Sequence, residues 1–157
     1  MSESRRIARI TFDERTGLRR SPEVEQERKV AIFDLLEGNS FALVNGDPGP
    51  YELRLGIREN RLVMEVRDEA GRALRTIVLA LGSFRRLIKD YFTVCDSYYQ
   101  AIKTAPPSRI ETIDMGRRGL HDQGSTLLIE RLAGKVELDF DTARRLFTLI
   151  CVLHIRG

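Results

Sequence analysis

The segment from Asp114 to Ser125 (DMGRRGLHDQGS) gathers the side chains of this sequence that could carry chemistry. If the segment is helical, residues four positions apart lie on one face, and the segment presents two adjacent rows. A histidine beside a carboxylate and a serine has the parts of an acid–base or nucleophilic site, and paired arginines can hold an anion. The candidate cluster consists of Asp114, Arg117, Arg118, His121, Asp122 and Ser125.

The same segment has a plainer interpretation, because alternating charge along a helix is typical of a solvated face. The sequence contains no phosphate-binding glycine loop, no dinucleotide-binding glycine motif, no HExxH, no GxSxG and no EF-hand loop. It has no CxxC pair, and His121 and His154 are far apart, so the spacing of an ordinary zinc site is missing. We therefore predict no metal and no cofactor, and the sequence favours a protein that is not an enzyme.

The helix that would position this cluster is predicted over residues 108–133. The run Ser108-Arg109-Ile110-Glu111 has the spacing of a capping box, which would start the helix. Gly116, Gly119 and Gly124 interrupt the pattern, and a glycine inside a helix costs about 1 kcal/mol relative to alanine. Two explanations remain open: close packing on a neighbouring helix, or a break near Gly124 that divides the segment into two helices.

The last stretch, from Asp139 to Gly157, is predicted to be the central core helix. Asp139 is a good N-cap residue, because its side chain can accept a hydrogen bond from a free backbone amide of the first turn. A helix that is apolar on all sides must be buried on all sides, and this one is too short to span a bilayer. The apolar residues that leave almost no hydrophilic face are Phe140, Ala143, Leu146, Phe147, Leu149, Ile150, Cys151, Val152, Leu153 and Ile155.

Residues 51–81 are predicted to form a three-stranded antiparallel meander, because apolar and charged residues alternate along them. With Glu59-Asn60 as a two-residue turn, apolar residues face each other on one side and opposite charges on the other. The first pairing joins Leu53 to Val66, Leu55 to Met64, Ile57 to Leu62, Glu52 to Arg67 and Arg54 to Glu65. A second turn at residues 68–71 places Val66 opposite Leu74, Glu65 opposite Arg75 and Leu62 opposite Val78.

This register creates an apolar patch on the outer face of the predicted sheet. It groups Val63 with Ile77, next to Gly56 and Leu79. An apolar patch on the face of a sheet is covered by another segment or by another chain. Val63, Ile77 and Leu79 are therefore the candidate interface residues.

The remaining elements complete an α+β fold. A short strand is predicted at residues 7–13, and a helix is predicted to start with Ser21 as its N-cap and to end before Gly38. Another amphipathic helix follows Ser83 as its N-cap. We predict one α+β domain over residues 1–157, in which an antiparallel meander of three to four strands packs with about four helices around the buried C-terminal helix.

Composition is typical of a cytosolic globular protein. The 157 residues are 42% hydrophobic and 31% charged, with no apolar run long enough for a membrane helix and no apolar N-terminal stretch of a signal peptide. Arginine makes up 22 of the 26 basic residues, at a net charge of only +3. The five arginine doublets begin at residues 5, 19, 85, 117 and 144. Because 23 acidic residues are interspersed with them, a compositional bias is favoured over a nucleic-acid surface.

Three runs of the sequence resemble an uncharacterised protein family of alphaproteobacteria, family 0262 of the UPF type. They are RRSPEVEQERKVAIFDLLEGNSF, FRRLIKDYFTVCDSYYQAI and IDMGRRGLHDQGSTLLIERLAGKVELDFDTARRLFTLICVLHIRG. The resemblance covers nearly the whole chain and implies a small bacterial cytosolic protein. It implies no activity, cofactor or catalytic residue.

Three functional hypotheses follow from the sequence. The first is a small cytosolic binding or regulatory protein that acts through contacts with an unknown protein partner or by self-association, and that has no membrane role. The second is an enzyme or a small-anion site at Arg117, Arg118, His121 and Asp122. The third is RNA binding through the arginine doublets, which should be tight and sensitive to salt.

Overall fold

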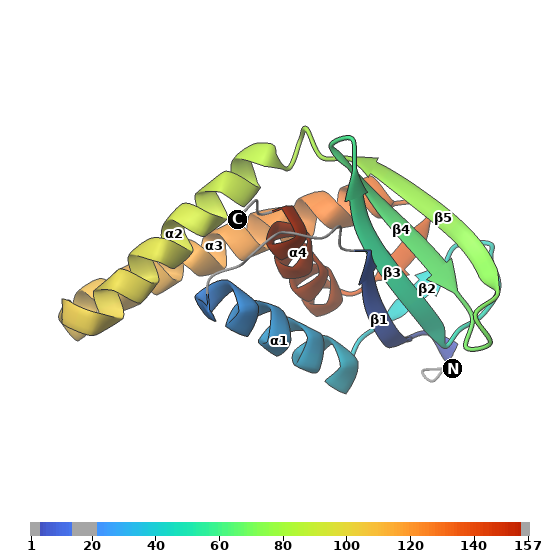
Figure 1. The fold of residues 1–157 in the computed structure, drawn as a ribbon, viewed down its shortest axis with the longest axis horizontal. Coiled ribbons are helices and arrows are strands. Elements are labelled where there is room, and N and C mark those ends of the chain that lie inside the picture. Colours follow the sequence, from blue (N-terminus) through green and yellow to red (C-terminus); the bar gives the residue numbers. More distant parts are fainter. Residues whose placement is uncertain (1–3, 14–21, 155–157) are drawn as a thin grey trace.

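A computed structural model describes residues 4–13 and 22–154, which form four helices and six strands (Figure 1). In chain order they are β1 (Ile7–Asp13), α1 (Pro22–Glu37), β2 (Phe41–Leu43), β3 (Tyr51–Arg58), β4 (Arg61–Arg67), β5 (Ala73–Ala80), α2 (Arg85–Thr104), α3 (Pro107–Leu132), β6 (Val136–Leu138) and α4 (Phe140–His154). The predicted α+β class is confirmed. The expected cap Ser21, the doublet at residues 19–20 and the helical end at residues 155–157 lie outside the described residues.

The larger sheet is mixed and has the strand order β1-β3-β4-β5. β1 runs parallel to β3, whereas β3, β4 and β5 pair antiparallel to their neighbours. The predicted antiparallel sheet is therefore wrong in its fourth strand. A parallel pair requires a long crossover, and the chain between β1 and β3 supplies one that includes α1 and β2. β2 pairs with β6 in a separate two-stranded antiparallel sheet.

The first hairpin has the predicted register. Leu53 pairs with Val66 and Arg54 with Glu65, and the other three predicted pairs are also present. Glu59 and Asn60 both have positive φ angles, 51° and 61°, as a two-residue type I′ turn requires. Alternation of apolar and charged residues was therefore sufficient to fix this pairing.

The second hairpin is shifted by one residue from the prediction. Arg67 pairs with Ala73 but Val66 pairs with Arg75, so Leu74 forms a bulge in β5. A shift of one residue moves every side chain beyond it to the other face of the sheet. In the observed register, Glu65 therefore faces Thr76, Val63 faces Val78, Met64 faces Ile77 and Leu62 faces Leu79.

The predicted outer patch does not form, because of this bulge. Ile77 and Leu79 are buried in the core, and Val78 is the exposed neighbour of Val63. The placement of Val63, Ile77 and Leu79 as one interface is therefore wrong. The outer face around Val63 also contains charged side chains that pair with one another, including Arg54.

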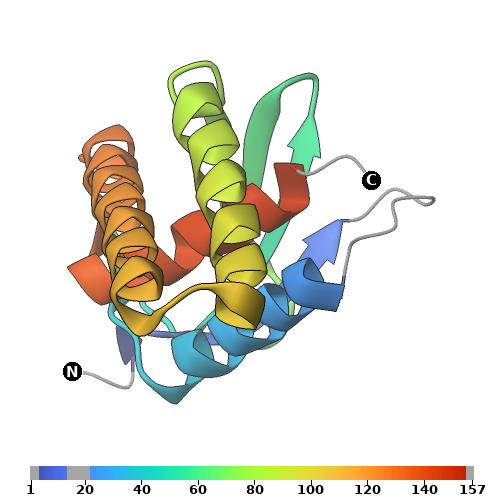
Figure 2. The same ribbon diagram turned by 90° about the vertical axis from the view of Figure 1, so that its left-hand side faces the viewer.

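Helix α4 lies between the sheet and the pair formed by α2 and α3, which project side by side (Figures 1 and 2). α1 packs along α4. Leu146 and Ile150 have no exposed surface and Leu153 is 9% exposed, whereas Phe140 at the start of α4 is 42% exposed. No helix in the described part of the chain is long and apolar enough to cross a membrane.

The helix starts follow the sequence at α4 but not at α2 and α3. The Asp139 Oδ1 atom accepts a hydrogen bond from the Thr142 amide at 2.9 Å, so the predicted N-cap is confirmed. α2 instead starts after the buried Phe84, and the predicted cap Ser83 is wrong. The predicted capping box is also wrong, because α3 starts after Pro106 and Ser108 already lies within the helix.

α3 is one continuous helix through its three glycines. A Cβ atom at Gly124 would lie 2.5 Å from ring carbons of Phe147, so only glycine permits the observed approach of α4. Close packing, and not a break, therefore explains this glycine. A Cβ atom at Gly116 or Gly119 would meet open space, and the structure gives no packing reason for these two.

Candidate functional site

A cleft of about 290 Å³ opens between α1, α3 and α4. Its walls combine charged side chains with a few small apolar ones. They are Gln26, Glu27, Val30, Ala31 and Asp34 from α1, Arg117 and His121 from α3, and Arg144, Arg145 and Thr148 from α4. Two members of the predicted cluster, Arg117 and His121, therefore line a cavity together with side chains from two helices distant in sequence.

Arg117 is held in place by carboxylates on two helices. Its guanidinium donates to Asp114 at 2.8 Å and to Glu27 at 3.2 Å. It also lies over the ring of Tyr98, 4.6 Å from the ring centroid, which favours a cation electrostatically. Burial alone would lower the pKa of Arg117, but the hydrogen bond that it donates to Asp114 and the charge of Glu27 raise it overall. This side chain is permanently charged and fixed in orientation.

Glu27 links α1 to both helices of the α2–α3 pair. Its carboxylate accepts a hydrogen bond from the Tyr99 hydroxyl at 2.7 Å and a longer one from the Tyr91 hydroxyl at 3.5 Å, besides the bond from Arg117. Burial and then the bond to Glu27 raise the pKa of Tyr99, so its hydroxyl remains a donor at neutral pH. The oxygens of Glu27 are therefore already used within the protein.

His121 lies at the base of the cleft and is only 6% exposed. Its ring packs 4.9 Å from the ring of Tyr91, and its Nε2 atom is 3.4 Å from the Thr148 hydroxyl. The Nδ1 atom is buried and has no hydrogen-bond partner in the described structure. Burial, followed by the charges of Arg144 and Arg117, lowers the pKa of His121 to about 4. The imidazole is therefore neutral at neutral pH.

The other predicted cluster residues do not reach the cleft. Ser125 is buried, and its hydroxyl donates to the backbone oxygen of His121 at 2.6 Å, within the same helix. Arg118 is mostly exposed and pairs with Asp114 at 2.7 Å. Asp122 is exposed on the solvent side of α3 and makes no ion pair among the described residues. The serine is thus committed to its helix, and the two predicted rows diverge around α3.

Asp114 does not line the cleft, but it pairs with Arg117, which does. Burial would raise the pKa of Asp114, but its hydrogen bond to Arg117 and the charges of Arg117 and Arg118 lower it overall. The carboxylate therefore stays ionised and holds both arginines. A positioning role for Asp114 follows from these contacts.

Sequence reasoning missed eight of the ten residues that line the cleft. Asp34, Arg144, Arg145 and Thr148 were not in the predicted cluster, although Arg144-Arg145 is one of the arginine doublets. The guanidinium groups of Arg144 and Arg145 and the carboxylate of Asp34 make no ion pair with any described residue. The doublet was the available signal, but nothing in the sequence placed it beside His121.

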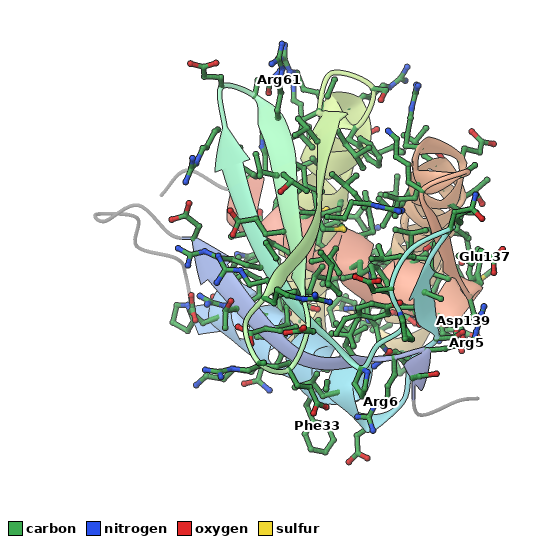
Figure 3. All side chains as sticks on the ribbon, turned by 90° about the vertical axis from the view of Figure 1, so that its right-hand side faces the viewer. Arg5, Arg6, Phe33, Arg61, Glu137 and Asp139 are labelled. Carbon is green, nitrogen blue, oxygen red and sulfur yellow. The ribbon has the colours of Figure 1, made fainter. Side chains whose placement is uncertain are left out.

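The remaining arginine doublets point to different sides of the molecule. Arg5 pairs with Glu137 at 3.0 Å beside the β2–β6 sheet, while Arg61, a single arginine outside the doublets, lies at the far end of the larger sheet (Figure 3). Arg85 and Arg86 are exposed at the start of α2. The described arginines therefore do not gather into one extended basic surface. In the described ranges, no group of three metal-ligating side chains comes together either.

The sequence has relatives that match it over nearly its full length. Residues 4–156 match the model of a family described as "Uncharacterised protein family (UPF0262)". A UPF0262 protein of Erythrobacter litoralis (strain HTCC2594) is 57% identical over 97% of this chain and 98% of the relative. A UPF0262 protein of Ruegeria sp. (strain TM1040) is 57% identical over 97% and 99%, and one of Rhodospirillum rubrum is 58% identical over 94% and 91%.

These matches confirm the resemblance inferred from the three sequence runs. No solved structure matches this fold. The names of the relatives state no ligand, partner or reaction, so a function has to be argued from the geometry of the cleft.

Proposed function

The chain belongs to the UPF0262 family, and we propose that it is a binding protein that holds a small anionic molecule in the cleft between α1, α3 and α4. One observation carries this proposal. Arg144 and Arg145 line a cavity of about 290 Å³, and their guanidinium groups have no ion pair with any described residue. Guanidinium groups match carboxylate and phosphate oxygens through paired hydrogen bonds.

The surroundings of the two arginines favour an anion over a neutral ligand. Arg117 stands in the same cleft and compensates the carboxylate of Glu27, which reduces the repulsion of an anion by that acidic residue. His121 is neutral and buried, so it contributes a polar surface without a competing charge. Val30 and Ala31 provide a small apolar wall against which the body of a ligand can pack.

The contacts of the predicted chemical groups support binding rather than nucleophilic chemistry at this site. The Ser125 hydroxyl is turned to the backbone of its own helix and is fully buried. Among the described residues, no carboxylate forms a hydrogen bond or ion pair with His121 that could orient it as a base, and its Nε2 atom faces the Thr148 hydroxyl. These are the features of a recognition site with rigid walls.

Calorimetry with matched double variants tests the proposal. The parent is titrated with inorganic phosphate, acetate, succinate and citrate, and then Arg144→Gln/Arg145→Gln is compared with Arg85→Gln/Arg86→Gln. Each lost charged hydrogen bond should cost about 1.5–3 kcal/mol, so the cleft variant should bind at least about tenfold more weakly. The control doublet is exposed on α2 and should leave affinity unchanged. No binding by the parent, or equal losses in both variants, would contradict the proposal.

A second candidate function is contact with a partner protein through α1. Phe33 is 64% exposed and Val30 is 44% exposed, which is unusual for large apolar side chains. Lys29, Ile32, Leu36 and Glu37 surround Phe33 in a shallow hollow. Phe33→Ser should then weaken self-association or partner capture, measured by analytical ultracentrifugation and pull-down. A parent that stays monomeric and captures nothing would count against this surface.

We also propose that the protein works in the cytosol and that α4 serves as its structural centre. The free, buried thiols of Cys95 and Cys151 support a reducing compartment, and burial raises the pKa of Cys95 to about 11, where a thiol is unreactive at neutral pH. The burial of Leu146 and Ile150 supports a purely structural role for the middle of α4. The ligand would then be held by the exposed start of the helix.

A further inference from the structure

The acidic and the basic residues that line the cleft come from different helices. Both acidic lining residues, Glu27 and Asp34, belong to α1. All the basic lining residues belong to α3 and α4. Positions 27 and 34 are two turns apart, so their side chains lie in one row along α1. A ligand in the cleft would therefore meet carboxylates on one side and guanidinium groups on the other.

Only part of this charge is satisfied within the protein. Glu27 and Arg117 are joined at 3.2 Å and close the cleft at one end of the acidic row. Asp34, Arg144 and Arg145 line the same cavity and make no ion pair with any described residue. One carboxylate on α1 and two guanidinium groups on α4 therefore lack an ion-pair partner among the described residues. A purely anionic ligand would be attracted by the two guanidinium groups and repelled by the carboxylate of Asp34.

We infer that the ligand is a small zwitterion, a molecule with a primary amine and a carboxylate such as a free amino acid. This inference rests on the proposed anion-binding function. The ligand carboxylate pairs with Arg144 and Arg145, and its ammonium group pairs with Asp34. The amine converts the repulsion at the α1 wall into an attraction. Simple carboxylates and phosphates leave Asp34 uncompensated, so they should bind more weakly than the zwitterion. The cavity of about 290 Å³ admits only a small molecule.

Pairs of ligands that differ only in the amine test this inference. The parent is titrated with L-alanine against propionate, L-aspartate against succinate, L-glutamate against glutarate and 4-aminobutyrate against butyrate. These pairs cover two separations between amine and carboxylate. At least one amine-bearing ligand should bind about tenfold more tightly than its partner, the gain expected from one charge-assisted contact.

Variants at Asp34 assign that preference to the α1 wall. Asp34→Asn should abolish the preference for the amine, because it weakens binding of the amine-bearing ligand and removes the repulsion of the matching carboxylate, whereas Asp34→Glu should retain the preference. The matched control is Asp122→Asn, an exposed carboxylate on α3 that does not line the cleft. Retained preference in Asp34→Asn would overturn the inference.

The possible failures are distinguishable. Equal affinity within every pair, with binding still lost in Arg144→Gln/Arg145→Gln, would overturn the zwitterion and leave anion binding intact. Absence of binding by every member of the panel and by inorganic phosphate would remove the proposed function and this inference with it.

Discussion

The outer face of the sheet and the wall of the cleft are built from the same residue types, yet they differ in how their charges are used. On the sheet, Asp13 accepts from Arg58 at 2.8 Å and pairs with Arg54 at 3.5 Å. Glu65 pairs with Arg67 at 3.1 Å. The hollow among these side chains measures about 10 Å³, too little for a ligand.

The cleft has the opposite character. Asp34, Arg144 and Arg145 stand beside about 290 Å³ of space and form no ion pair with described residues. The difference shows that the abundance of arginine does not locate a binding site in this protein. We therefore propose the binding site at the cleft, where charged groups lack ion-pair partners among the described residues and a cavity is present.

The largest expected effect comes from removing the support of the cleft. Phe147→Ala takes away a fully buried ring that packs on Gly124 and Tyr91. We expect the free energy of unfolding to fall by about 3–5 kcal/mol in urea titrations. Phe140→Ala is the matched control in the same helix, because that ring is exposed, and it should cost less than about 1 kcal/mol. Equal losses in the two variants would show that α3 and α4 do not pack as described.

The next effect is a loss of stability on acidification caused by His121. Its pKa falls from the ordinary 6.5 to about 4 in the fold. Unfolded chains therefore take up a proton as pH falls below 6.5, while the folded protein does not until about pH 4. The free energy of unfolding should drop by about 3 kcal/mol across this window and then level off with respect to this group. In His121→Gln the drop should be much smaller, and an unchanged pH profile would place the cause elsewhere.

The next effect is smaller and compares how much an ion pair stabilises the protein in the cleft and on the sheet. Glu27→Gln breaks a partly buried pair with Arg117 and weakens the link to Tyr99, which should cost about 1–3 kcal/mol. Glu65→Gln on the sheet removes pairs that are more open to solvent and should cost less than about 1 kcal/mol. Chemical denaturation of both variants gives the comparison. A larger loss in the sheet variant would reverse the contrast between the two regions.

The smallest expected effect is that of Asp13→Asn. A partly exposed pair contributes at most about 1 kcal/mol at neutral pH. The hydrogen bond and charge of Arg58 lower the pKa of Asp13, against the opposing effect of burial. This contribution is present above the ordinary pKa of 3.8 and is lost as pH falls below that value. The difference between parent and variant in urea should therefore be constant from pH 7 to pH 5, and a difference that changes within that range would contradict it.

The parts of the fold set by neighbouring residues could be predicted from the sequence. The register around Leu55 and Met64 follows from alternation and a two-residue turn, and the start of α4 follows from Asp139 as a cap. The bulge at Leu74 could not be predicted, because its neighbours alternate as well in either register. That one residue was enough to bury Ile77 and to remove the predicted patch.

The candidate site was predictable only on one wall. Arg117 and His121 share a face of α3, and helical spacing is sufficient to find them. Asp34 and Arg145 come from α1 and α4, and their position beside α3 depends on tertiary packing, which includes the approach allowed by Gly124. Single-sequence periodicity does not contain that information.

The most direct test of ligand binding in the cleft is a nitrogen–proton correlation spectrum recorded during titration with inorganic phosphate and with L-alanine. We expect saturable shifts at Arg117, His121, Arg144 and Arg145, and unchanged signals at Arg54 and Arg58 on the sheet. Shifts centred on the sheet, or no saturable shifts anywhere, would contradict binding in the cleft.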